Sequence, residues 1–258
     1  MSPLKSLLAK AICVCLLPLK LKQDVLHYAK GVALLDPNEH LYRAARYIKA
    51  STPDVRGAYV LDVGAADGGS ARWLSRHLKG TKIVCLEPNP GMVQVLRARL
   101  RGTGIEIREL ALGGSVGSAT LRVTRDPLAS SVKTVDEGVL AKSTSAYRRG
   151  LEETAQIDVR QSTLDDEFST LSDILLLKLD TQGSELDILG SGSYTLSRTR
   201  FVLTEMSNHS HYRGSCRYYE IDAFLRKSGF RLADLVVTYH TYEGGTLEFD
   251  ALYERASI

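Results

Sequence analysis

From residue 58 onward, short apolar runs alternate with longer amphipathic stretches, and this alternation limits the folds that are open to the chain. Short apolar runs between turn signals are typical of buried strands. Strands that alternate with helices form parallel sheets, because each helix returns the chain to the end of the sheet at which the previous strand began. The expected strands are AYVLDVG (58–64), TKIVCLE (81–87), IEIREL (105–110), DILLLKLD (173–180) and FVLTEM (201–206).

The expected sheet has a centre and one exception to its parallel order. DILLLKLD is the most apolar run, and a strand covered by helices on both faces has this pattern, so we place it at the centre. RLADLVVTYHT (231–241) and TLEFDALYER (246–255) are joined by Glu243-Gly244-Gly245, which is a hairpin signal. A terminal hairpin makes the last strand antiparallel. The sequence therefore predicts an α/β, Rossmann-like fold.

The stretch between the third strand and the central strand is less regular. ATLRVT (119–124) has the pattern of an added strand. Residues 125–155 are polar and rich in Ser and Thr, so we expect a long loop or lid there. Long loops in compact domains often carry function.

Charge and cysteine content exclude some classes of function. The chain has 33 Lys and Arg against 30 Asp and Glu, a formal net charge of +3, which is too balanced for nucleic acid to be the main partner. The 4 cysteines are scattered and form no Cys-x-x-Cys pair, so a reducing compartment fits best. We therefore expect a cytoplasmic protein without a nucleic-acid partner.

Residues 1–50 are expected to form an N-terminal helical segment, followed by the main domain over 51–258. The run AICVCLLPL (11–19) is flanked by Lys10 and Lys20. It is about half the ~20 apolar residues that a membrane span requires. A helix packed on the domain, a membrane-surface helix with basic flanks and a signal-peptide core all remain open. The second alternative implies peripheral membrane association.

The turn after the first strand, DVGAADGG (62–69), is the first candidate for ligand binding. Glycine lets a backbone turn sharply and approach a ligand closely, and the amides at the start of the following helix point to the same place. A glycine-rich turn by itself is weak evidence. The residues that we assign to cofactor binding in this turn are Asp62, Gly64, Ala65, Asp67 and Gly68.

The second strand adds a carboxylate to this turn. Glu87 ends that strand 23 residues after Gly64, close to the separation at which an acidic residue accepts hydrogen bonds from ribose hydroxyls. The alternative is a solvated loop carboxylate. Together the glycine turn and Glu87, with Pro88 beside it, predict a nucleoside ligand.

Three features favour S-adenosylmethionine over a nicotinamide cofactor. Asp62 lies two residues before Gly64, where it can reach the amino-acid part of S-adenosylmethionine. The chain contains no Tyr-x-x-x-Lys pair, the acid/base pair of short-chain dehydrogenases. The central strand ends in a further carboxylate, Asp180, which a switch-point crevice brings toward the same ligand.

These motifs resemble the FkbM-type methyltransferases. The resemblance is carried, in order, by VLDVGAADGGS (60–70), CLEPNP (85–90), LASS (128–131), STLDD (162–166), LLKLDTQGSELDILGSG (176–192) and VLTEMS (202–207). It implies a class I methyltransferase fold, with a mostly parallel seven-stranded sheet and an antiparallel C-terminal strand. It also implies methyl transfer to an oxygen, with a sugar or another small-molecule hydroxyl as acceptor.

One segment departs from the family pattern. The family usually has an asparagine near the end of the helix after EPNP, whereas VLRARLRG carries Arg97, Arg99 and Arg101 there. We expect this difference to affect the helix end locally and to leave the cofactor motifs untouched.

A base must accept the proton of the acceptor hydroxyl, and the candidates lie where strands end. On chemistry alone His209 is the better base and Glu205 the better positioner of a hydroxyl, because an imidazole titrates near neutral pH. His211 and the 125–155 stretch are alternatives. Two other classes of function stay open, an NAD(P)-binding oxidoreductase and a methyltransferase-like domain that binds ligand without catalysis.

Asp180 has several readings. It can bind the methionine amino group of the cofactor, cap the helix that begins near Ser184, or join Glu205 and Asn208 as oxygen ligands of a divalent cation. We expect the first role and no metal.

Overall fold

A computed structural model describes residues 38–138, 145–209, 212–240 and 246–256. The chain divides into two units, residues 1–39 and residues 40–258, and the second unit holds most of the described residues. The run AICVCLLPL and the Glu243-Gly244-Gly245 turn lie outside the described residues, so the expectations about them stay predictions. None of the helices within the described ranges is long and apolar enough to cross a membrane.

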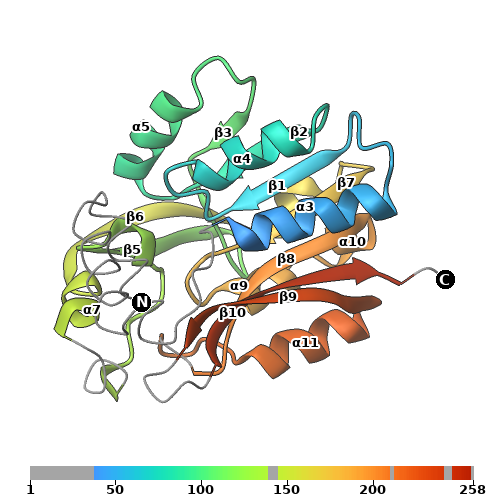
Figure 1. The fold of residues 1–258 in the computed structure, drawn as a ribbon. Coiled ribbons are helices and arrows are strands. Elements are labelled where there is room, and N and C mark those ends of the chain that lie inside the picture. Colours follow the sequence, from blue (N-terminus) through green and yellow to red (C-terminus); the bar gives the residue numbers. More distant parts are fainter. Residues whose placement is uncertain (1–37, 139–144, 210–211, 241–245, 257–258) are drawn as a thin grey trace, which may run out of the picture. The chain divides into compact units, whose positions relative to one another are not determined.

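A seven-stranded sheet forms the centre of this unit, with the order β3-β2-β1-β7-β8-β10-β9 (Figure 1). All neighbouring strands are parallel except β10, which pairs antiparallel with β8 and β9. This confirms the predicted class I methyltransferase fold with its antiparallel C-terminal strand. The strands are β1 (Tyr59–Val63), β2 (Lys82–Leu86), β3 (Glu106–Arg108), β7 (Ile174–Leu179), β8 (Thr199–Ser207), β9 (Phe230–His240) and β10 (Thr246–Arg255).

Helices cover both faces of the sheet. One face carries α3 (Glu39–Ser51), α4 (Gly69–His77) and α5 (Pro90–Arg99), whose apolar side chains share one buried cluster. The other carries α8 (Leu164–Phe168), α9 (Glu185–Gly190), α10 (Ser193–Ser197) and α11 (Tyr218–Lys227), which share a second cluster. Strand β7 lies between the two layers with all six residues buried, which confirms its predicted central place.

The helix starts follow local chemistry. Asn89 caps α5, because its side chain accepts a hydrogen bond from the Gly91 amide at 3.0 Å, and Pro90 occupies the first helical position. Helix α3 buries the apolar stripe Leu41, Ala44, Ala45 and Ile48 against the sheet. Helix α3 therefore packs as part of the main unit. The predicted division of the chain at residue 50 stays a prediction.

A second, three-stranded sheet stands beside the first, with the order β4-β6-β5. Its strands are β4 (Ala111–Leu112), β5 (Gly117–Thr124) and β6 (Glu153–Ser162), and Ala111, Leu121 and Val159 form its own small core. The added strand at ATLRVT is thus confirmed. The expectation of a single long loop over 125–155 is wrong, because its described part holds a short helix (Pro127–Ala129), α7 (Ser145–Gly150) and the start of β6.

Candidate cofactor and acceptor site

The carboxyl ends of β1, β2, β7 and β8 meet at one edge of the main sheet. From β1 the strand order runs outward through β2 to β3, whereas β7 and β8 extend from β1 in the opposite direction. A crevice at such a switch point binds ligands in open α/β sheets. Every residue that the sequence assigned to the site lies at the end of one of these strands or in the loop that follows it.

Close backbone contacts shape the turn after β1. Gly64 and Gly68 both have φ of +78°, and Ala66 has φ of +46°. A Cβ atom on Gly64 would lie 1.9 Å from the carbonyl oxygen of Asp180, and one on Gly68 would lie 2.6 Å from Leu96. The Asp180 backbone therefore requires glycine at position 64 before any ligand is considered, whereas at position 68 the positive φ favours glycine and the Leu96 side chain could shift.

Two other residues of the turn are engaged with the protein itself. Ala65 is buried, and its amide donates to the Leu86 carbonyl at 3.0 Å. The Asp67 carboxylate accepts a hydrogen bond from the Gly69 amide at 2.8 Å and pairs with Arg99. Arg99 belongs to the segment that departs from the family pattern. Our expectation that this segment leaves the cofactor motifs untouched is therefore wrong, since it holds the glycine turn by an ion pair.

Glu87 lies at the end of β2 with only 7% of its surface exposed. One of its oxygens accepts a hydrogen bond from the Ala66 amide at 2.9 Å, and the other from the Asn89 amide at 2.8 Å. Burial raises the pKa of Glu87 while these two amides oppose the rise. The glycine turn and the start of α5 thus fix the carboxylate in place, with Pro88 partly buried beside it. Each oxygen keeps a further lone pair for a ribose hydroxyl.

A buried lysine joins the ends of β1 and β7. Lys178 Nζ lies 3.3 Å from the Asp62 carboxylate and 3.3 Å from that of Asp180. Burial lowers the pKa of Lys178, but the two carboxylates outweigh it and raise the pKa. Asp62 is 0% exposed, whereas 40% of the Asp180 side chain is exposed. Asp62 therefore pairs with Lys178 inside the protein. Asp180 is the carboxylate of this group that a ligand can reach.

The loop that follows β7 is held by a buried carboxylate of the same motif. Glu185 accepts hydrogen bonds from the amide of Thr181 at 2.8 Å and from that of Gly183 at 3.0 Å. The loop turns through Gln182, with φ of +58°, and Gly183, with φ of +104°. Asp180 does not cap α9, because Ser184 stands at that position. The motif from Lys178 to Glu185 thus fixes a tight loop with Gln182 at its tip.

Gln182 connects three parts of the site. Its side-chain amide nitrogen donates to Asp180 at 3.2 Å and to Glu205 at 3.1 Å. Its side-chain oxygen accepts a hydrogen bond from the Tyr212 hydroxyl at 3.0 Å. Ser131, in the LASS segment, donates to the Gln182 carbonyl at 2.7 Å. Gln182 therefore links the ends of β7 and β8 to segments that lie far away in the sequence.

Glu205, near the end of β8, lies in an acidic environment. It is opposite Asp250 in the β8–β10 register. Burial, followed by the nearby Asp180 and Glu248, raises the pKa of Glu205 well above its usual range. Burial and Asp180 raise the pKa of Asp250 to about 7. A carboxylate with a raised pKa is a stronger base than an ordinary one, so Glu205 is a candidate general base.

His209 lies just beyond Glu205 and lines the same small hollow, together with Tyr212 and Gln182. Its side chain is exposed, and Ser207 hydrogen-bonds its backbone amide and carbonyl. The structure thus brings the two candidate catalytic residues together, but only Glu205 belongs to the hydrogen-bonded network of described residues. His211 lies outside the described residues.

Two of the three side chains considered for a divalent cation, Asp180 and Glu205, are engaged with a cation or an amide of the protein. Asp180 contacts Lys178 and Gln182, and Glu205 also contacts Gln182. Among the described residues, no group of three His, Cys, Asp or Glu side chains has the arrangement of a metal site. The absence of a metal stays a prediction.

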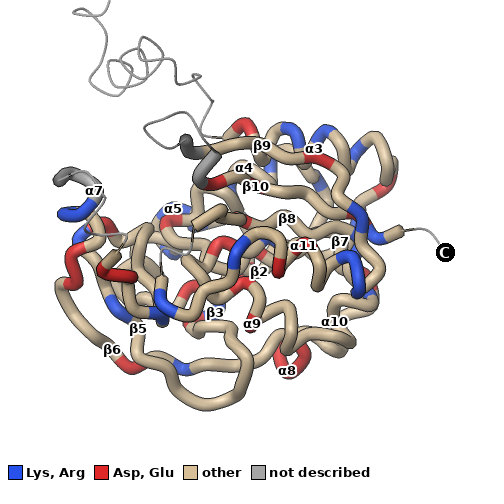
Figure 2. The backbone as a smooth tube through the Cα atoms, turned by 90° about the horizontal axis from the view of Figure 1, so that it is seen from below, with Lys and Arg blue, Asp and Glu red and all other residues tan. Residues whose placement is uncertain are grey.

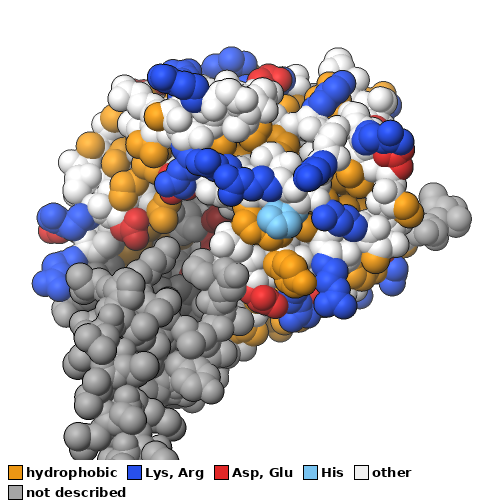
Figure 3. All heavy atoms as spheres, turned by 45° about the horizontal axis from the view of Figure 1, so that its top comes forward, with side chains coloured by type: hydrophobic (Ala, Val, Ile, Leu, Met, Phe, Trp, Pro, Cys, Tyr) orange, Lys and Arg blue, Asp and Glu red, His pale blue; other side chains and the backbone are white. Residues whose placement is uncertain are grey.

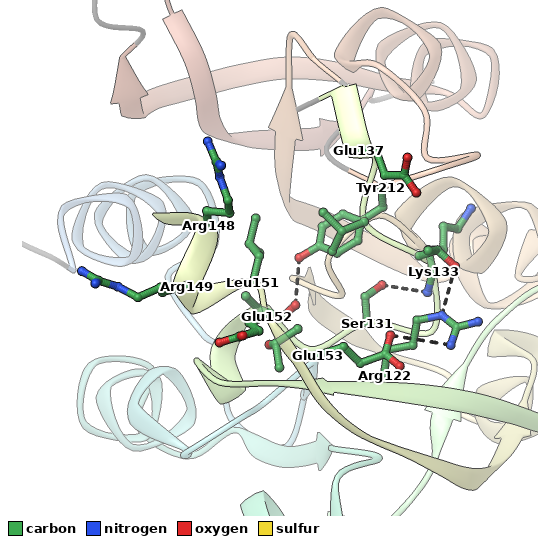
Figure 4. A pocket seen from close by; sticks show the side chains of 14 residues that line it. Arg122, Ser131, Lys133, Glu137, Arg148, Arg149, Leu151, Glu152, Glu153 and Tyr212 are labelled. Atoms are coloured by element: carbon green, nitrogen blue, oxygen red, sulfur yellow. Dashed lines mark hydrogen bonds and ion pairs between the residues drawn. The ribbon is translucent and has the colours of Figure 1, made fainter. Parts of the chain in front are cut away.

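A cavity of about 460 Å³ opens beside this network, between β5, β6, α7 and the segment around Ser131 (Figure 4). Tyr212 lines both this cavity and the hollow that holds Glu205. In Figure 4 the Tyr212 ring stands between the second sheet and the main sheet, close to Ser131 and Lys133. The Tyr212 hydroxyl also donates to the Ala129 carbonyl at 2.9 Å. One residue therefore joins the cavity to the candidate base.

The sequence missed three members of this network: Gln182, Tyr212 and Asp250. Gln182 lies within the motif LLKLDTQGSELDILGSG (176–192), two residues after Asp180, and this position was a signal for a role in the site. Tyr212 and Asp250 carried no such signal, because their roles depend on pairing between β8 and β10 and on a segment packed against the second sheet.

Comparison with known protein families decides the class. Residues 62–232, more than half of the chain, match the family described as the methyltransferase FkbM domain. The chain belongs to the FkbM methyltransferase family. This confirms the resemblance inferred from the motifs and favours methyl transfer over the hydride transfer of a nicotinamide enzyme.

One curated relative of this FkbM-family chain is the 2-O-methyltransferase NoeI of Sinorhizobium fredii (strain NBRC 101917 / NGR234). The two are 29% identical over 164 residues, which cover 60% of this chain and 65% of the relative. The chain thus spans slightly less than two thirds of that relative's length.

Two solved structures of low sequence identity are similar to this chain. Magnesium protoporphyrin IX methyltransferase (ChlM) from Synechocystis PCC 6803 has a TM-score of 0.49 at 11% identity, covering 85% of this chain and 79% of that one. Methyltransferase FkbM from Methylobacillus flagellatus KT has a TM-score of 0.48 at 14% identity, covering 85% and 50%.

Proposed function

We propose that the protein is an S-adenosylmethionine-dependent methyltransferase that methylates a hydroxyl group of a sugar or another small molecule. The observation that carries this proposal is the network that runs from Asp180 through Gln182 to Glu205 and Tyr212. It links the strand ends that would hold the cofactor to a cavity that would hold the acceptor. The name of the curated relative, a 2-O-methyltransferase, supports an oxygen acceptor.

The carboxylates at the β1–β2–β7 edge fit S-adenosylmethionine. Glu87 is fixed by two backbone amides and can accept both ribose hydroxyls. Asp180 is the exposed carboxylate of the lysine-centred group and suits the ammonium of the methionine part. Asp62 acts through Lys178, because it is fully buried. When bound, the cofactor supplies a methyl group that its sulfonium already activates for displacement.

Glu205 is the proposed base. The acceptor hydroxyl must lose its proton as its oxygen forms the new bond to carbon, and Glu205 takes that proton. The Gln182 amide holds the Glu205 carboxylate at 3.1 Å and so fixes its direction. The sequence favoured His209 for this role. The exposure of His209 and the raised pKa of Glu205 give a reason to reverse that order.

The cavity of about 460 Å³ is the proposed acceptor site. Ligand pockets for small molecules have volumes of about 300–1,000 Å³. The cavity is lined by hydroxyl, basic and acidic side chains, among them Ser131, Thr134, Arg122 and Glu153. Such a mixture of donors and acceptors suits a polyhydroxylated ligand such as a sugar.

Turnover of methyl-labelled S-adenosylmethionine against a panel of glycans, glycolipids and small hydroxylated metabolites tests the proposal. We expect label in at least one sugar or small hydroxylated compound. Calorimetric titration with S-adenosylmethionine and with NADP⁺ separates the alternatives. Binding of NADP⁺ alone would support an oxidoreductase, and binding of S-adenosylmethionine without turnover on any acceptor would support a non-catalytic domain.

A further inference from the structure

The two helix layers carry opposite charge, which the overall net charge conceals. The fully described helices α3, α4 and α5 contain one carboxylate, Glu39, whereas their Lys and Arg residues are Arg43, Arg46, Lys49, Arg72, Arg76, Arg97 and Arg99. The opposite layer of α8, α9, α10 and α11 contains two basic residues, Arg226 and Lys227. Its carboxylates are Asp165, Asp166, Glu167, Glu185, Asp187, Glu220 and Asp222. Figure 2 shows where both kinds of charge fall along the backbone.

Ion pairs neutralise some of the basic residues in and next to α3, α4 and α5, but one group of these residues has no such partner among the described residues. Arg43, Arg97 and Arg99 form ion pairs. In the part of the chain that the structure describes, no ion pair is formed by Arg46, Lys49, Arg72, Arg76 or Lys79, and all five are exposed. We call these five residues the basic face. Figure 3 looks toward this side of the molecule, and blue side chains predominate over red ones on it.

Helix dipoles explain only some of these charges. Lys49, Arg76 and Lys79 lie at or near helix carboxyl ends, where cations are favoured. Arg46 and Arg72 lie further inside their helices. The helix dipole also does not explain why α4 and α5 contain no carboxylate. The basic face therefore points to an external anionic partner.

We propose that the basic face docks on an anionic lipid surface. A planar membrane touches one side of a protein only, so the acidic layer on the other side of the sheet carries no penalty. The chain also supplies a hydrophobic element, since the run AICVCLLPL with flanking Lys10 and Lys20 precedes α3 in the sequence. A basic patch combined with an apolar segment is the two-signal pattern of peripheral membrane proteins.

A nucleic acid is less well matched to this arrangement. It would use the positive charge but not the apolar run, and the acidic layer would repel a polymer that wraps around the protein. Four of the five residues of the basic face lie away from the glycine turn, and Arg72, in the first turn of α4, is the one next to it. Helix α4 begins at the glycine turn, and Arg76 and Lys79 lie at or beyond its other end, roughly 10 Å away at 1.5 Å per residue.

The test is sedimentation of the full chain with phosphatidylcholine vesicles, with and without phosphatidylglycerol. The variant Arg72→Gln/Arg76→Gln/Lys79→Gln removes three charges of the basic face. Each Lys or Arg near an anionic membrane contributes ~1 kcal/mol, a roughly fivefold change in affinity. We expect at least a tenfold loss of binding to the phosphatidylglycerol vesicles and little change with phosphatidylcholine alone. Added salt should weaken the wild type more than the variant.

A control removes the same number of charges from the remainder of the surface, through Arg200→Gln, Arg226→Gln and Lys227→Gln, of which the first two also break ion pairs with Asp173 and Asp222. It should bind the vesicles like the wild type. Equal losses in both variants would mean that net charge alone acts, and this would overturn the proposal. So would vesicle binding that does not depend on phosphatidylglycerol, or a basic-face variant that loses affinity for a short RNA but not for vesicles. None of these outcomes depends on methyl transfer.

Discussion

At the functional edge, Glu87 on the β1–β2 side is held by backbone amides, whereas Glu205 on the β7–β8 side is held by another side chain. Glu87 is fixed by two backbone amides, and the turn before it by the close approach of Gly64 to the Asp180 carbonyl. Glu205 is fixed by Gln182, which Tyr212 in turn orients. Substitutions of Glu87 or of the glycine turn should therefore affect folding and cofactor binding together, and those of Glu205 or Tyr212 should affect the acceptor reaction alone.

The largest effect is expected from Gly64→Ala. Gly64 and Gly102 have nearly the same φ, +78° and +77°, but a Cβ on Gly102 would have no atom within 4 Å. Left-handed backbone with a Cβ costs ~1–2 kcal/mol by itself. We expect Gly102→Ala to lower the free energy of unfolding by that amount. We expect Gly64→Ala to lower it by roughly 3 kcal/mol or more, since the Cβ would meet the Asp180 backbone. Urea unfolding measures both.

Equal losses in the two glycine variants would contradict the close packing of β1 against β7. A Gly64→Ala protein that is as stable as Gly102→Ala, yet binds S-adenosylmethionine poorly, would instead assign Gly64 to the ligand alone.

The next effect is expected from Glu205→Gln, which keeps the size of the side chain and an oxygen for Gln182. Loss of a general base lowers turnover by roughly 10²–10⁴-fold. The dissociation constant for S-adenosylmethionine should be nearly unchanged, because Glu87 and Asp180 remain. Turnover at saturating cofactor and calorimetry give the two quantities. A large loss of cofactor affinity would show that the two sides of the edge are not separate.

The pH dependence sharpens this test. The proposed reaction needs the unprotonated carboxylate, and burial raises the pKa of Glu205 above its usual value. The rate should therefore rise with pH through that raised pKa, and the acidic limb should lie at a higher pH than for an ordinary glutamate. Glu205→Gln should lose the limb, whereas His209→Ala should keep it. The opposite result would return the base to His209.

The same division explains how much of the molecule its sequence could predict. The central place of β7, the antiparallel β10 and the carboxylate at Glu87 follow from apolar runs and short spacings, which act locally along the chain. The acceptor side unites Ser131, Gln182 and Tyr212, which come from three separate segments. Strand β6 has mostly exposed residues and lacks an apolar run, so its pairing with β5 gave no signal in the sequence.

A smaller effect is expected from Glu87→Ala on the cofactor side. The substitution removes the acceptors for two ribose hydroxyls, each worth roughly 1.5–3 kcal/mol, so affinity for S-adenosylmethionine should fall at least about tenfold. It also leaves the amides of Ala66 and Asn89 without their partner, so the free energy of unfolding should fall as well. Calorimetry and urea unfolding on one preparation test both. Glu87→Gln, which keeps one oxygen, should be intermediate; unchanged affinity in Glu87→Ala would refute the ribose assignment.

Tyr212→Phe should act on the acceptor side with a still smaller effect. The single proton of the hydroxyl is shared between the Ala129 carbonyl and the Gln182 side-chain oxygen, and a hydrogen bond of this kind contributes about 1 kcal/mol. We expect a roughly fivefold rise in KM for the acceptor with cofactor affinity unchanged. Tyr47→Phe is the matched control, since its hydroxyl bonds Glu254 at 3.0 Å on another part of the sheet. Equal effects of both variants on KM would mean that Tyr212 acts through stability only.

The smallest expected effect is that of a chelator, which should leave turnover unchanged. The two carboxylates that could face a divalent cation already have partners, because Lys178 lies 3.3 Å from Asp180 and the Gln182 amide donates to both Asp180 and Glu205. A cation at this place would have to displace the Gln182 amide and would stand close to the Lys178 ammonium, so repulsion would oppose its binding. Rates with EDTA and with added Mg²⁺ or Mn²⁺ measure this. Activity that is lost in EDTA and restored by a divalent cation would reverse the argument, and Lys178→Met should then bind that cation more tightly than the wild type.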